Sequence, residues 1–232
     1  MPPVRTLVAA VALALGLAPG LFAQDLSAYR GFALGSTIAA VTARTETNPS
    51  AVTLAHARPA LLQELEWRPS RWNSGSSEPS TDPVERVRFS FCDDQLYRLA
   101  VDYVPERTEG LTTTDMVAAL TGEYGTPLPR TASRVMRTLS ALENESGTVA
   151  ARWEDASHSV VLYRTSSYRD SYRLLITDTR LEAVARTAEA QATRLDAQEA
   201  PARELARQKK ELDDSRAAGE KARAVNKGGF RP

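Results

Sequence analysis

The histidines and the cysteine are the residues of this sequence best suited to metal binding, nucleophilic attack or proton transfer. They are His56, His158 and Cys92. A zinc site needs about four nitrogen, sulfur or oxygen ligands with characteristic close spacing, and neither HExxH nor CxxC occurs in the chain. Cys92 ends a strand-like run without a nearby histidine or lysine to lower its pKa, so we interpret it as a small buried residue. The sequence therefore predicts neither a metal nor a cofactor.

Acidic residues gather at two places that we interpret as turns. The stretch "EDASH" holds Glu154, Asp155 and His158, and Asp93 is followed directly by Asp94. Aspartate is a common turn residue, so a turn explains both clusters without a ligand. The chain also lacks a GxSxG elbow, a phosphate-binding glycine loop and a calcium loop. A protein without catalytic activity is favoured, and an enzyme or small-ligand binder with an unrecognised site remains an alternative.

The first 23 residues have the pattern of a secretory signal peptide. Arg5 gives the start a positive charge, residues 7–17 are apolar, and Pro19 interrupts the apolar run before Ala23. The run is shorter than the roughly 20 residues that span a bilayer. We expect cleavage near Ala23 and a soluble periplasmic or secreted protein without a membrane span after cleavage. An uncleaved anchor is the alternative.

The composition limits the class of partner and the source of stability. With 42% hydrophobic and 25% charged residues, the chain is typical of a globular protein. Its 29 basic and 29 acidic residues balance, which argues against a nucleic-acid partner. One cysteine forms no intramolecular disulfide, so stability must come from core burial. The composition leaves the oligomeric state open.

The first half of the chain predicts a helix followed by strands. A capped helix is expected near residues 36–44, and residues 62–67 weakly favour an extended segment. Residues 71–83 are rich in Ser, Pro, Gly and Asn and predict an exposed loop. Two alternating runs joined by "DDQ" then predict an antiparallel hairpin that ends near residue 104.

The second half repeats this order. Thr112 and Asp115 have capping-box spacing at the start of a helix that should end at Gly125. Three alternating runs from residue 148 to residue 179 predict a three-stranded meander. The repeat is also visible in "LYRLAV" (96–101) and "SYRLLI" (171–176). We predict an α+β fold of two tandem helix-and-meander units, 24–105 and 106–180, with two small antiparallel sheets and helices on one face.

Two stretches carry a resemblance to known exported proteins. "FALGSTIAAV", a glycine turn that opens a short helix ahead of a meander, resembles modules of the small outer-membrane-assembly lipoproteins and of β-lactamase-inhibitory proteins. "TEGLTTTDMVAALTGEYGTP" followed by "ARWED" resembles uncharacterised exported bacterial proteins. The first resemblance implies a nonenzymatic protein that binds other proteins. The lipidated cysteine of the lipoproteins is missing here, and no binding residue is carried over.

The C-terminal region changes to Ala, Arg, Glu and Lys. We expect a charged helix over 181–216, broken or kinked at Pro201, and a disordered tail over 217–232. Polar residues in the seam weaken the case for a coiled coil. The first and fourth heptad positions of this helix hold the apolar residues Leu181, Val184, Ala188, Leu195, Ala202, Leu205 and Leu212.

Aromatic residues and arginines interleave along the predicted strands, and these types are enriched in binding hot spots. We take Trp67, Arg98, Trp153 and Arg173 as candidate binding residues. The competing interpretation places the aromatics in the core and the arginines on the solvated face, as strand alternation predicts. The preferred function is an exported module that binds an envelope protein through a sheet face. The alternatives are an enzyme or small-ligand binder, and a structural tether that acts through the C-terminal helix.

Overall fold

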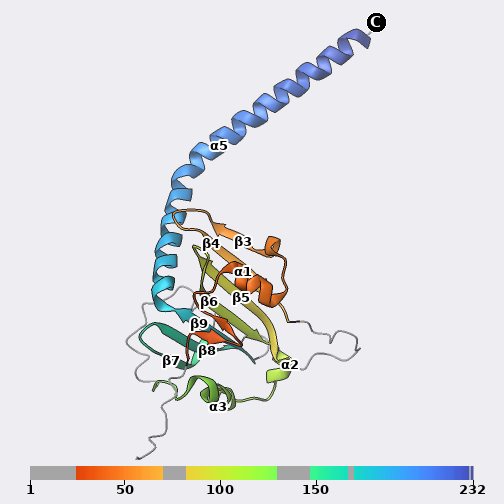
Figure 1. Ribbon diagram of the computed structural model, residues 1–232. Helices are drawn as coiled ribbons and strands as arrows, with labels where there is room; N and C mark the ends of the chain where they lie inside the picture. Colours follow the sequence, from red (N-terminus) through yellow and green to blue (C-terminus); the bar gives the residue numbers. More distant parts are fainter. Residues whose placement is uncertain (1–24, 70–81, 130–146, 167–169, 230, 232) are drawn as a thin grey trace, which may run out of the picture.

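A computed structural model describes residues 25–69, 82–129, 147–166, 170–229 and 231 (Figure 1). The predicted signal peptide and most of the predicted loop over 71–83 lie outside these residues. Among the helices in the described part of the chain, none is long and apolar enough to cross a membrane.

The fold is α+β, as the sequence predicts. A long antiparallel sheet has the strand order β3-β4-β5-β6-β9-β8-β7, and β1 and β2 form a separate two-stranded sheet. The elements are β1 (Ala28–Tyr29), β2 (Phe32–Ala33), α1 (Ile38–Thr45), the 3-10 helix η1 (Pro49–Ala51), β3 (Thr53–His56), β4 (Leu62–Trp67), β5 (Val84–Cys92), β6 (Gln95–Tyr103), α2 (Pro105–Thr108), α3 (Thr113–Tyr124), β7 (Thr148–Glu154), β8 (His158–Ser166), β9 (Asp170–Asp178) and α5 (Thr179–Gly229).

The two predicted meanders share one seven-stranded sheet and do not form two separate ones. They join where β6 pairs with β9, so that Leu99 lies opposite Ile176 and Val101 lies opposite Leu174. These are the strands that contain "LYRLAV" and "SYRLLI". An unpaired strand edge leaves a row of backbone groups without partners, and pairing the last strand of each meander satisfies both rows.

The helices α1 and α3 cover one face of this sheet, and the main core lies beneath them. Val41 of α1 and Met116 of α3 belong to the same buried cluster as the sheet residues. The strand members of this cluster alternate with residues of the other face, as a pleated sheet requires. The largest fully buried side chains of the cluster are Trp153, Phe89, Phe91, Leu65, Leu96, Leu99, Leu162, Leu174 and Ile176.

The turn between β5 and β6 has a wider structural role than the sequence indicated. Asp93 and Asp94 both have positive φ, at 48° and 64°, as a two-residue hairpin turn often requires. Asp93 Oδ1 accepts a hydrogen bond from the Leu61 amide at 2.9 Å, and Asp94 Oδ1 accepts one from the Ile38 amide at 2.9 Å. Asp94 thus helps Thr37, the N-cap residue, to satisfy the free amides of α1.

The capping box predicted at the start of α3 is confirmed. The Thr112 hydroxyl accepts from the Asp115 amide, and the Asp115 carboxylate accepts from the Thr112 amide. We expect Thr112→Ala to lower the free energy of unfolding by about 1 kcal/mol, because an amide of the first turn loses its partner. Urea denaturation measures this, with Thr114→Ala in the same turn as the control. Equal losses in the two variants would contradict a capping role.

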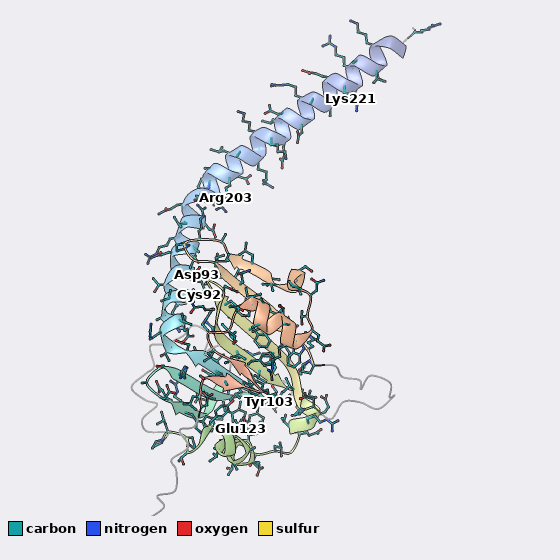
Figure 2. All side chains as sticks on the ribbon, viewed as in Figure 1. Cys92, Asp93, Tyr103, Glu123, Arg203 and Lys221 are labelled. Carbon is teal, nitrogen blue, oxygen red and sulfur yellow. The ribbon has the colours of Figure 1, made fainter. Side chains whose placement is uncertain are left out.

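The helix α5 extends further than the sequence predicts, and it bends where a break or kink is predicted, at Pro201. It continues from Thr179 to Gly229, beyond the position where the sequence predicts a disordered tail, because Ala, Arg, Glu and Lys are strong helix formers. Pro201 lies inside the helix, which bends close to Arg203 (Figure 2).

The face by which α5 packs on the domain coincides only in part with the predicted heptad stripe, which shares Leu181 and Ala188 with it. The packed residues include Leu181, Ala185 and Ala188, whereas Val184 is 53% exposed. Small alanine side chains allow the helix to lie close to the sheet, and a search for large apolar residues misses such a face. The proximal part of α5 covers the second sheet face next to Cys92 (Figure 2).

Candidate functional site

The second face of the sheet carries both predicted binding arginines, Arg98 and Arg173, and further arginines beside them. Strand pairing aligns Arg88, Ala100 and Leu175 in one row across this face, and Arg86, Asp102 and Arg173 in the next row. We call this surface the arginine face. Its arginines are Arg86, Arg88, Arg98, Arg152 and Arg173.

Asp102 organises the arginine face from its centre. Its Oδ2 accepts hydrogen bonds from Arg86 Nε at 2.9 Å and from Arg86 Nη2 at 2.7 Å, and its Oδ1 accepts one from Arg173 Nε at 2.5 Å. The Asp102 side chain is 14% exposed, whereas those of Arg86 and Arg173 are 26% and 24% exposed. Both guanidinium groups are therefore held in fixed positions on the sheet.

The environment of Asp102 keeps its carboxyl ionised. Burial alone would favour the neutral form, but hydrogen bonds and charges from Arg173 and Arg86 outweigh burial and hold the pKa below its ordinary value. The negative charge is matched locally by two positive ones. Glu66, 3.8 Å from Arg86, adds a second negative charge, so Arg86 and Arg173 are held in place by acidic partners of the chain itself.

Arg98, a predicted partner-binding residue, makes its contacts within the chain. Its Nη2 lies 3.5 Å from Glu182 Oε1 of α5, and its guanidinium lies over the Tyr97 ring at 5.1 Å from the ring centroid. The helix α5 covers this end of the arginine face. The sequence prediction did not take into account that the protein's own helix occupies the face.

Trp153 lies in the core and is also not a surface binding residue. It is 1% exposed, and its Nε1 donates a hydrogen bond to the Gly125 carbonyl at 2.7 Å. Trp67 is half-buried against Phe32, with ring centroids 5.6 Å apart. Both tryptophans lie on the face that α1 and α3 cover. Strand alternation therefore separates the tryptophans from the arginines that the sequence analysis combined with them in one patch.

Arg173 is the predicted residue that the structure places at the open part of the arginine face, and Arg88 lies close to it. Arg88 is half-buried and forms no ion pair with any residue that the structure describes. Glu66 lies opposite Arg88 on the neighbouring strand, but its carboxylate forms ion pairs with Arg68 at 2.8 Å and with Arg86 at 3.8 Å. We call Arg88, Ala100 and Leu175 the Arg88 site. In the sequence, Arg88 is visible only as a residue of an alternating strand. Alternation does not show which arginines have ion-pair partners.

Comparisons with known proteins identify no relative of this chain. No family model, curated protein or solved structure matches the chain. The expected resemblance to outer-membrane-assembly lipoproteins and β-lactamase-inhibitory proteins remains a prediction. What this protein does must therefore be argued from its own residues.

The candidate catalytic residues behave as structural ones. Asp155 accepts hydrogen bonds from the Ser157 and His158 amides and contacts His158 Nδ1 at 3.0 Å, which is a local turn arrangement. Cys92 is buried, and burial raises the pKa of its thiol. In the described residues, no group of three or more His, Cys, Asp or Glu is placed to hold a metal ion.

Two surface hollows contain few groups that could perform acid-base chemistry. One has a volume of about 510 Å³ beside the start of α3 and contains Glu109 and Arg164. The other lies along α1, has a volume of about 700 Å³ and contains Glu46 and Asp94. Neither hollow is lined by a histidine or a cysteine. Convergent acids and bases, which an enzyme alternative requires, are not found at either place.

Proposed function

We propose that this protein is an exported, non-catalytic module that holds an acidic segment of an envelope protein on its arginine face. The N-terminal pattern of the sequence supports export. The observation that carries the binding function is the Arg88 site, where a partly exposed guanidinium has no ion partner in the described residues and lies beside Ala100 and Leu175.

The charge of this surface suits an acidic partner. Asp102 pairs with Arg86 and Arg173, and Glu66 pairs with Arg68 and Arg86, so Arg88 is left without an ion pair among the described residues. A partner carboxylate would form the missing ion pair, and an adjacent apolar side chain would cover Ala100 and Leu175. Because Asp102 already fixes Arg86 and Arg173, Arg88 alone among these three arginines loses side-chain freedom on binding.

The test is affinity capture from an envelope fraction with the mature chain, followed by affinity measurements with the purified captured protein. We expect Arg88→Glu to weaken binding at least about tenfold and added salt to weaken it further, because the contact is an ion pair. Arg194→Glu, an exposed charge reversal on α5, is the matched control and should bind like the wild type. Equal binding by Arg88→Glu and the wild type would refute the proposal, and so would the failure to capture any protein.

A structural tether remains a second candidate because of one observation. Every residue from 201 to 229 is exposed, and this part of α5 leads away from the domain (Figure 1). Deletion of residues 202–229 separates the two functions. Capture that survives the deletion supports the arginine face, whereas capture that is lost with the deletion and retained by Arg88→Glu supports the tether.

A further inference from the structure

The hollow along α1 is a groove with acidic ends. Its floor is formed by small or apolar side chains of α1, including Ile38, Ala39 and Ala43. Asp94 lies at the N-terminal end of α1, and Glu46 lies at its C-terminal end. The one basic residue of α1, Arg44, turns away from the groove and lies over the Phe32 ring. The groove therefore suits an apolar surface that carries basic residues.

The distal part of α5 has such a surface. We call residues 202–229 the arm. The contacts that hold α5 on the hairpin of β3 and β4 end with the ion pair between Arg58 and Glu199, just before Pro201. Beyond this point Leu205 is 66% exposed and Leu212 is 70% exposed. A helix that packs on nothing is only marginally stable in water, so the arm gains from a partner surface.

The spacing of residues on the arm matches the groove. Leu205, Lys209, Leu212 and Arg216 follow one another at intervals of four, three and four residues, which places them on one side of a helix. Neither Lys209 nor Arg216 forms an ion pair with a described residue. The two leucines are seven residues apart, and so are the two cations, which corresponds to about 10.5 Å along the helix axis. The eight residues of α1 extend about 12 Å, so the two lengths are similar.

We propose that the arm of one chain docks into the α1 groove of a second copy. Leu212 lies between the two cations and covers the apolar floor of the groove, and Leu205 packs one turn beyond Lys209 at the end of the groove. Lys209 and Arg216 pair with the acids at the two ends. The arm of the same chain leads away from the domain and does not lie in its own groove (Figure 1). A two-fold axis allows each chain to give its arm and receive the other, so the contact is made twice and the assembly closes as a dimer.

The test is the mass of the mature chain, measured by light scattering and sedimentation across a concentration series. The wild type should form a dimer. An arm variant, Leu205→Gln with Leu212→Gln, keeps helix propensity and should lower the association constant by about a hundredfold or more. A groove variant, Ala39→Arg with Ala43→Arg, changes exposed α1 residues and should do the same, because it fills the groove and repels the arm. Circular dichroism establishes that both variants are folded.

Mixing the two variants makes the test specific. The arm variant retains an intact groove and the groove variant retains an intact arm, so a mixed pair makes one of the two contacts and should associate more tightly than either variant alone. Val225→Gln, which lies on the opposite side of the arm, is the control and should dimerise normally. A monomeric wild type, a dimer that resists either variant, or a mixture that associates no more tightly than the variants alone would each overturn the proposal.

Discussion

Trp153→Ala is expected to lower the free energy of unfolding by about 3 to 5 kcal/mol, the range found for the removal of a buried large aromatic side chain. The side chain is 1% exposed, contacts the Tyr124 ring at 6.1 Å between centroids, and holds the end of α3 through its hydrogen bond to Gly125. Its removal leaves a cavity between the sheet and α3. Urea denaturation followed by circular dichroism measures the loss.

Two further variants separate the causes of this loss. Trp153→Phe keeps most of the buried surface but leaves the Gly125 carbonyl without its donor, so we expect a smaller loss of about 1 to 2 kcal/mol. Trp67→Ala, at a half-buried position, should also cost less than Trp153→Ala. An unchanged unfolding midpoint for Trp153→Ala would mean that Trp153 is not a core residue.

The second large effect is expected for Asp102→Asn. The substitution keeps the size of the side chain but removes the charge that two half-buried guanidinium groups share, so we expect a loss of about 2 to 3 kcal/mol at neutral pH. Asp196→Asn is the matched control. Its carboxylate pairs with Arg203 but is 50% exposed, so its loss should stay below about 1 kcal/mol. Similar losses for the two variants would contradict a central role for Asp102.

The pH dependence of the Asp102 effect has a defined sign. Its pKa is lowered in the folded protein, so its contribution is fully present above the unfolded value of about 3.9 and is lost as the pH falls through the folded pKa. The difference in unfolding free energy between the wild type and Asp102→Asn should therefore be constant above about pH 5 and shrink in more acidic solution. Denaturant titrations at a series of pH values measure it.

Local patterns predicted the elements of the fold well. The alternation in β5 and β6 and the capping box of α3 depend on neighbouring residues, and such signals are complete in a single sequence. The joining of the two meanders through β6 and β9 is a long-range choice between strand edges. Nothing local to either strand specifies its partner, so the sequence could not distinguish one sheet from two.

The candidate site was less predictable for the same reason. Strand alternation correctly predicts that arginines and tryptophans lie on opposite faces, but the choice of Arg98 also required knowing where α5 packs. Which arginines are neutralised depends on contacts such as that between Asp102 and Arg173, which are distant in the chain. Arg88 stands out only once those contacts are known.

The seam between β6 and β9 bears on how the chain folds. During synthesis, which starts at the N-terminus, the first meander is complete at β6 and leaves the edge of this strand unpaired. The edge stays unpaired until β9, the last strand of the second unit, has been made. Pairings so distant in the chain close slowly, and an open edge invites association with other chains in the meantime. A polypeptide that ends before β9 should thus aggregate, although it contains the whole first unit. The nascent protein reaches a protected state only late in its synthesis, when β9 completes the sheet and α5 packs across β5, β6 and β9.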